Sequence, residues 1–154
     1  MKDITEAKRY ISDAKEILRE KAIKEDGFYK DRKYVKMAGH TAYSGVLVAL
    51  DSILGDKKKK TRKSVEWYQK ELSITDKKIL SYFLAAYDVL HLSMGYDGVL
   101  SAAVSTEGLQ LAEKIIDWAE RKTQAWHYPT LINQWTPGLK QPVPAHCLSH
   151  FLVY

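Results

Sequence analysis

Proline is missing from the first 128 residues of this 154-residue chain. Because proline lacks a backbone N–H and clashes with the preceding turn, it is excluded from helix interiors, and a long stretch without it is compatible with uninterrupted helices. All four prolines fall near the C-terminus, at Pro129, Pro137, Pro142 and Pro144. This distribution predicts an all-α domain over residues 1–122 and an irregular C-terminal tail over residues 123–154.

Cysteine is nearly absent as well. Cys147 is the single cysteine, so no intrachain disulfide can form. The opening Met-Lys-Asp-Ile-Thr-Glu has no apolar core of the kind that a secretory signal needs. The longest weakly charged stretch, residues 79–96, contains Asp88 and His91 and is barely long enough to span a bilayer. We therefore expect a cytoplasmic protein without a membrane span.

Acidic residues are missing from the tail, which has Lys140 as its one strong base. A solvated linker should also be poor in aromatic residues. Residues 123–154 nevertheless contain Trp126, Tyr128, Trp135, Phe151 and Tyr154. The tail is expected either to pack along the bundle as irregular chain or to be a non-native end of the sequence.

Apolar residues recur at three- and four-residue spacing four times along the rest of the chain, which is the pattern of helices with one buried side. The short connections favour antiparallel neighbours, so the sequence predicts a mainly antiparallel bundle of four long helices plus one short helix. Capping signals at Asp3, Asp31 and Ser73, and glycines at Gly27, Gly55 and Gly95, set the expected ends. The predicted long helices cover residues 3–25, 31–54, 74–94 and 99–122, and the short one covers residues 64–72.

Two glycines, Gly39 and Gly45, lie inside the second predicted helix. Glycine in a helix interior costs about 1 kcal/mol relative to alanine. Their presence predicts a close backbone approach by a neighbouring helix, with Gly45 at a tight crossing.

The net charge of +5 comes from one basic segment, residues 57–63. Outside that segment, acidic residues outnumber basic residues by one. Lysine contacts with phosphate give salt-dependent affinity that is independent of nucleotide sequence, and Trp67 and Tyr68 nearby could stack on bases. The alternative interpretation is a solvated loop that keeps the protein in solution. The segment consists of Lys57, Lys58, Lys59, Lys60, Arg62 and Lys63.

A second group of polar residues is predicted by helical spacing. Four side chains share one side of the second helix, and two more on the third helix could face them across a groove as an anion-binding or acid–base cluster. The alternative is polar decoration of a helix–helix or dimer interface. The six residues are Arg32, Lys36, His40, Tyr43, Tyr87 and His91.

No metal or cofactor site is predicted. Asp88 and His91 have the spacing of a carboxylate–imidazole pair, but a di-metal bundle needs a second such pair, and the positions before His40 hold Met37 and Lys36. The tail histidines, His127, His146 and His150, match no standard spacing either.

Two stretches are distinctive when taken with the order of the helices: Arg32-Lys33-Tyr34-Val35 to Ala49-Leu50-Asp51, and Ala85-Ala86-Tyr87-Asp88 to Gly95-Tyr96-Asp97-Gly98. Together they resemble the HEPN-type helical bundles of bacteria. More closely, residues 3–122 resemble a small bacterial family of bundle proteins known only as a domain of unknown function.

HEPN bundles commonly dimerise, and many act in toxin–antitoxin or defence systems as metal-independent ribonucleases. Those nucleases share an arginine and a histidine separated by four to six residues, whereas seven residues separate Arg32 from His40. The departure favours a binding or accessory role.

Three functions are therefore expected, in this order. The first is a non-enzymatic bundle that acts by association, as a homodimer and with an unknown protein partner. The second is a nucleic-acid-binding accessory protein of a toxin–antitoxin or defence system. The third is a HEPN-like ribonuclease with a degenerate motif.

Overall fold

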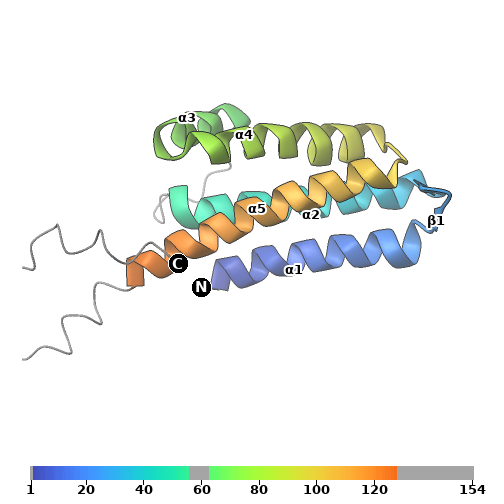
Figure 1. Cartoon of the computed structure of the whole chain (residues 1–154), viewed down its shortest axis with the longest axis horizontal. Helices are drawn as coiled ribbons and strands as arrows, with labels where there is room; N and C mark the ends of the chain where they lie inside the picture. The colour runs from blue at the N-terminus through green and yellow to red at the C-terminus, as the bar shows by residue number, and fades with distance from the viewer. Residues whose placement is uncertain (1, 56–62, 128–154) are drawn as a thin grey trace, which may run out of the picture. The chain divides into compact units, whose positions relative to one another are not determined.

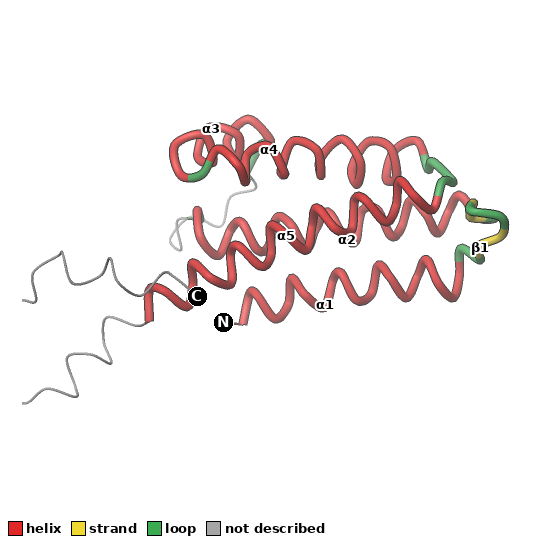
Figure 2. The backbone as a smooth tube through the Cα atoms, viewed as in Figure 1, coloured by secondary structure: helices red, strands yellow, loops and turns green. Residues whose placement is uncertain are grey.

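The computed structural model describes residues 2–55 and 63–127. The chain divides into two units, Met1–Gln124 and Ala125–Tyr154, and the arrangement of helices given below is that of the first unit. Figures 1 and 2 show the elements, which in chain order are α1 (Lys2–Glu16), η1 (Ile17–Lys21), β1 (Lys24–Glu25), β2 (Phe28–Tyr29), α2 (Arg32–Leu54), α3 (Val65–Thr75), α4 (Lys77–Ala86), η2 (Tyr87–Asp97) and α5 (Ala102–His127).

The described part of the chain is all-α apart from the two-residue strands β1 and β2. The π-helical segments η1 and η2 continue α1 and α4 without a break, so each pair forms one long helical rod. The four rods are α1 with η1, α2, α4 with η2, and α5, while α3 is the short helix. The predicted fold class, four long helices plus one short one, is confirmed.

Contacts between neighbouring rods show that the bundle is antiparallel. In α1 and α5, Lys8 meets Glu120 and Lys15 meets Glu113, so residue numbers rise in one helix as they fall in the other. In α2 and η2, the start of α2 at Arg32 lies against Gly98, and Tyr43 lies against Tyr87. Figure 1 shows α1 and α4 on opposite sides of α2 and α5.

The core runs along the centre of the bundle. Every rod contributes to it, and the largest side chains that are fully buried include Leu50 of α2, Phe83 of α4, Leu90 of η2 and Ile115 of α5. Full burial of one such side chain stabilises the folded state by about 1.5–3 kcal/mol relative to leaving it in water. Helical periodicity in the sequence therefore places the core correctly.

Gly45 lies at a tight crossing, as predicted. A Cβ atom built on Gly45 would lie 2.9 Å from Cβ of Tyr10 and 3.0 Å from the carbonyl oxygen of Ala7, both in α1. The absence of a side chain lets α2 and α1 approach closely.

The first helical rod ends earlier than predicted. It stops at Lys21 and not at residue 25, and Lys24–Glu25 pairs with Phe28–Tyr29 as an antiparallel hairpin. Gly27 lies in the hairpin turn, with φ of 83°, and does not end the helix. Hydrogen bonds to a distant segment decide this local structure: the amide of Tyr29 donates to the carbonyl of Leu100 (2.8 Å), and the amide of Ala102 donates to the carbonyl of Gly27 (2.9 Å).

The boundary between the short helix and the third rod is also displaced. Ser73 was the predicted cap, but it lies inside α3, where its hydroxyl donates to the carbonyl of Lys70. Asp76 is the cap of α4, because its backbone is extended and its carboxylate accepts from the amides of Lys78 and Ile79. Aspartate satisfies two of the amides that lack a partner in the first turn of a helix.

Two further boundaries differ from the prediction. The third rod ends at Gly98, whose φ of 66° suits a left-handed helix cap, and not at Gly95. The last helix continues to His127, five residues beyond the predicted end at residue 122, so the irregular tail does not begin at residue 123. Within this extension the hydroxyl of Thr123 donates to the carbonyl of Ala119 (2.9 Å).

Within residues 2–55 and 63–127, no helix is both long enough and apolar enough to cross a lipid bilayer.

Candidate functional site

The α2–η2 seam is the line of contact between α2 and η2. The two rods approach each other closely there, because a glycine stands on each side. A Cβ atom built on Gly39 of α2 would lie 2.6 Å from the carbonyl oxygen of Leu90 and 2.7 Å from Cβ of Met94. From the other side, a Cβ atom on Gly95 of η2 would lie 2.8 Å from Cε1 of His40. Each rod thus uses a glycine to admit the other, which brings the polar side chains next to the glycines into contact.

Four rings meet along the α2–η2 seam. His91 of η2 is central: its ring centroid lies 4.9 Å from that of Tyr43, 5.1 Å from that of Tyr87 and 5.8 Å from that of His40. The Tyr43 and Tyr87 rings meet edge to face at 5.9 Å. These centroid separations fall in the range preferred by paired aromatic rings, each pair contributing about 0.5–1.5 kcal/mol beyond burial.

Two of these rings, Tyr87 and His91, belong to the π-helical segment η2. The hydroxyl of Ser93 donates to the carbonyl of Asp88, five residues earlier, at 3.0 Å. π-Helical turns are rare and occur frequently at functional sites. Sequence periodicity could not reveal this winding, because three- and four-residue spacings fit an ordinary α-helix over residues 74–94.

The chemistry of the cluster is limited by burial. Desolvation, followed by the nearby charge of Tyr87, raises the pKa of Tyr43 to about 12. The Tyr43 hydroxyl therefore stays protonated near neutral pH and can donate a hydrogen bond but cannot act as a base. The arrangement supports ring contacts between the two rods.

Arg32 and Lys36 extend the same line toward the end of the bundle. Their aliphatic stems lie over Gly98: a Cβ atom on that glycine would collide with Cγ of Arg32 and lie 2.9 Å from Cε of Lys36. The structure therefore brings all six residues of the predicted polar cluster, Arg32, Lys36, His40, Tyr43, Tyr87 and His91, to the α2–η2 seam. A role in anion binding or acid–base chemistry stays a prediction.

Most of the basic segment lies outside the described residues, namely Lys57, Lys58, Lys59, Lys60 and Arg62. Lys63 is described, and its side chain is mostly buried. Its ammonium group forms an ion pair with Asp51 (2.7 Å) and lies 4.6 Å from the ring centre of Trp67. These two interactions compete with any phosphate for Lys63.

Tyr68 does not provide the base-stacking surface suggested by its sequence position. It is a core residue, and its hydroxyl donates to the carboxylate of Asp51 at 2.7 Å. Desolvation and the Asp51 carboxylate raise the pKa of Tyr68 above its usual value. Asp51, which sequence reasoning did not single out, thus links the end of α2 to Tyr68 of α3 and to Lys63 just before α3.

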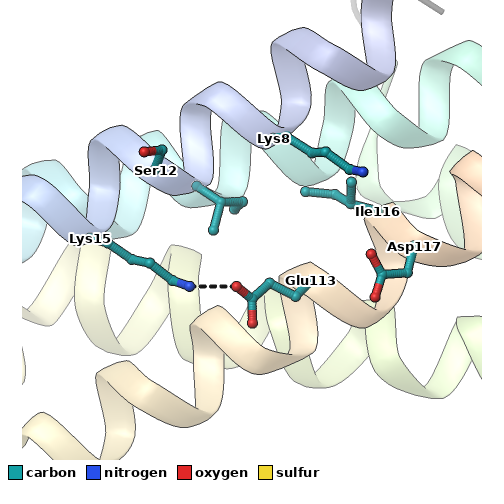
Figure 3. Close-up of a pocket in the computed structure, with 7 residues that line it drawn as sticks. Lys8, Ser12, Lys15, Glu113, Ile116 and Asp117 are labelled. Carbon is teal, nitrogen blue, oxygen red and sulfur yellow. Dashed lines mark hydrogen bonds and ion pairs between the residues drawn. The ribbon is translucent and has the colours of Figure 1, made fainter.

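A charged groove between α1 and α5, here called the α1–α5 groove, was also missed. Figure 3 shows Lys8, Ser12 and Lys15 of α1 facing Glu113 and Asp117 of α5 across a hollow of about 390 Å³. The Lys15 and Glu113 side chains bridge it at 2.5 Å, and the Lys8 and Glu120 side chains do so at 2.7 Å.

The seven-residue spacing of the two lysines and of the two glutamates is the signal that could have found the α1–α5 groove. Between the bridges, the floor of the hollow is apolar, with Ile11 of α1 and Ile116 of α5 lining it.

Among the described residues, no group of three or more histidine, cysteine, aspartate or glutamate side chains is arranged to hold a metal ion.

Comparison with known proteins identifies the family. The profile of a domain of unknown function, DUF5618, matches residues 2–121, and the chain belongs to this family. A solved structure, a protein of unknown function from Dyadobacter fermentans, is 56% identical, covers 79% of this chain and 96% of its own, and superimposes with a TM-score of 0.73. No curated protein matches the chain. The resemblance to a domain of unknown function is thereby confirmed.

Proposed function

We propose that this member of the DUF5618 family is a non-catalytic association module that pairs with a second copy of itself through the outer face of α2 and of the rod formed by α4 with η2. The observation that carries the proposal is a row of exposed apolar side chains on that face. Leu84, Leu92 and Tyr96 are 39%, 38% and 71% exposed. Asp88 lies between them in the same four-residue spacing.

The row borders the α2–η2 seam. Met37 of α2, also exposed, lies three residues before His40, and the His40 ring contacts His91 in η2. The proposal assigns Met37 and the row on the neighbouring rod to one face. Removing such side chains from water stabilises an association by about 25 cal/mol per Å² of apolar surface, and contiguous exposed apolar surface is typical of protein interaction sites.

Charge on this face favours a second copy as the partner. Arg32, Lys33 and Lys36 lie on α2, whereas Asp88 and Asp97 lie on η2. A two-fold axis parallel to the rods places α2 of one subunit over η2 of the other at the same height along the bundle. Because the start of α2 is level with the end of η2, the basic side chains of each copy then meet Asp97 of its partner. Such an isologous interface uses the same patch twice.

The decisive experiment measures molecular mass by sedimentation across a wide protein concentration range. We expect the wild-type chain to dimerise and Leu92→Asp to raise the dissociation constant at least about tenfold, because the interface would bury an unpaired carboxylate. Ile74→Asp is the matched control, since Ile74 is 78% exposed on α3. A monomeric wild-type chain, or equal effects of the two substitutions, would overturn the proposal.

A charge reversal tests the arrangement of the two copies. Lys33→Glu should weaken the dimer. Adding Asp97→Lys should restore it, because the charges at positions 33 and 97 then exchange signs and attract each other again across the interface. Failure of this rescue, together with an intact effect of Leu92→Asp, would reject the proposed two-fold axis while keeping the dimer.

Two alternatives stay proposals. A nucleic-acid-binding role in a toxin–antitoxin or defence system rests on the charge of Lys57–Lys60 and Arg62. A HEPN-like ribonuclease would need Arg32 and His40 to act on one phosphate. RNA cleavage by the purified chain that is lost in His40→Ala would replace the association proposal with the nuclease.

A further inference from the structure

A second hollow lies at the end of the bundle where η1, the β1–β2 hairpin and α5 meet. Its volume is about 460 Å³, within the range of about 300–1,000 Å³ typical of small-molecule sites. Leu18 and Leu109 form its buried floor, and Ile23 and Tyr29 line it from the hairpin side. This hollow is separate from the α2–η2 face, so it concerns a function beyond the proposed dimer.

The rim of the hollow is cationic. Lys15, Arg19 and Lys24 line it, and no carboxylate does. Arg19 is paired with the adjacent Glu20 in an exposed contact at 3.0 Å, and exposed pairs of this kind contribute little, at most about 1 kcal/mol. Lys15 turns toward Glu113 at the boundary with the α1–α5 groove. A ligand with a negative charge can therefore recruit these cations.

Ile23 adds an independent observation. Its φ is 51°, a left-handed conformation that is an outlier for a β-branched residue. Its carbonyl accepts the amide of Lys30 at 2.9 Å, which holds the conformation in place. Glycine or asparagine would satisfy this backbone without strain. The isoleucine side chain is nevertheless 55% exposed and lines the hollow.

Strain of this kind persists where surrounding structure enforces it, and it occurs preferentially at ligand clamps and active sites. The adjacent π-helical segment η1, Ile17–Lys21, is a second unusual backbone at the same place.

We propose that this hollow binds a small amphipathic organic anion, with an aliphatic or aromatic body against Leu18, Ile23 and Leu109 and a carboxylate toward Arg19 and Lys24. The Tyr29 side chain is half-buried at the same wall. Desolvation raises the pKa of Tyr29 above its usual value, so its hydroxyl is a hydrogen-bond donor over the whole neutral range.

Calorimetric titration with octanoate tests the proposal, with octanol and octylamine as neutral and cationic probes of the same chain length. We expect octanoate to bind and the other two to bind at least about tenfold more weakly, because only the carboxylate is attracted by the rim. Equal binding of the alcohol and the acid would overturn the cationic part of the proposal. No heat change and no shift of the melting temperature with octanoate would overturn it entirely.

Ile23→Gly separates binding from folding. The substitution relieves backbone strain, so the melting temperature should stay the same or rise, whereas octanoate affinity should fall about tenfold as the apolar contact is lost. Unchanged affinity in this folded variant would show that Ile23 does not contact the ligand and would reject the site.

Lys24→Gln and Lys30→Gln form a matched pair within the hairpin. Lys24 lines the hollow, whereas Lys30 forms an ion pair with Glu25 outside it. Octanoate affinity should fall several-fold in Lys24→Gln and stay unchanged in Lys30→Gln. Equal losses would indicate long-range attraction by net charge in place of a built site.

Discussion

Along the α1–α5 groove the contacts repeat every seven residues, whereas along the α2–η2 seam they follow no simple repeat. In the groove, Lys8 and Lys15 bridge to Glu120 and Glu113 over an apolar floor. In the seam, Gly39 and Gly95 remove side chains so that backbone and rings come into direct contact. Both surfaces join antiparallel rods of similar length. Charged side chains span the α1–α5 groove, whereas the α2–η2 seam is closely packed.

The difference shows where substitutions should matter. A bridge between exposed side chains can be lost while the apolar floor below it stays in place. A side chain added at a glycine in the seam meets backbone atoms, which cannot move aside without shifting a whole rod. The comparison therefore predicts large effects in the seam and small effects in the groove.

Gly39→Leu should have the largest effect. Its side chain would collide with the carbonyl oxygen of Leu90 and with Met94, and we expect a loss of about 3 kcal/mol in the free energy of unfolding, the upper end of typical overpacking costs. Gly45→Leu, facing Tyr10 and Ala7 of α1, should cost roughly 1–3 kcal/mol. Urea denaturation monitored by circular dichroism measures both values. A smaller cost at Gly39 than at Gly45 would contradict the ranking.

Alkaline pH should have the next largest effect, a loss in the free energy of unfolding that arises at the α2–η2 seam. The pKa of Tyr43 is raised to about 12 in the folded chain and is about 10 in an unfolded chain. The stability that this shift contributes is fully present below pH 10 and is lost as pH rises through the folded pKa. At a pH of about 11.5, the loss due to Tyr43 alone should be about 2 kcal/mol.

Tyr43→Phe provides the control for the alkaline effect. Urea denaturation near neutrality and at high pH should show a smaller loss in this variant than in the wild-type chain. Equal losses in the two chains would assign the pH dependence to other titrating groups, such as Tyr68.

Removing a bridge of the α1–α5 groove should have a small effect. Lys15 and Glu113 are about half exposed, and exposed pairs contribute about 0.2–1 kcal/mol. A double-mutant cycle with Lys15→Ala and Glu113→Ala should give a coupling energy of about 0.5 kcal/mol that declines with added salt. A coupling above about 2 kcal/mol would show that the groove is more rigid than the exposure of its side chains indicates.

Neutralising Lys58, Lys59, Lys60 and Arg62 should change stability least, within about 0.5 kcal/mol. The same variant tests the nucleic-acid alternative, because each lost phosphate contact should flatten the salt dependence of RNA or DNA affinity by about 0.7–0.9. Binding assays between about 50 and 200 mM salt make this comparison. Binding that does not respond to the four substitutions would reject a role for these residues in phosphate contact.

Much of the bundle could be predicted from the sequence. Proline distribution and helical periodicity located the four rods, and the glycine at position 45 correctly indicated a tight crossing. Errors occurred where distant segments act on local structure. Asp76, for example, accepts hydrogen bonds from the α4 amides and also from the indole of Trp118, 42 residues away, so its role was not visible in local capping patterns alone.

The candidate sites also combine features that the sequence predicted with features that depend on the tertiary structure. Spacing on one helix placed Arg32, Lys36 and His40 on one side of α2, and the structure set them against η2. The strained Ile23 could not be foreseen, because the sequence predicted a helix to residue 25, whereas the structure has a hairpin in which the Ile23 carbonyl accepts the amide of Lys30.

The sequence by itself determined the helical class, the number of long rods and the side of each rod that is buried, because these follow from residue-by-residue preferences and periodicity. Only the tertiary structure decided the π-helical winding of η2, the stacking around His91 and the cationic hollow beside Ile23. Those features arise from contacts between residues far apart in the chain, whose energies no local pattern contains.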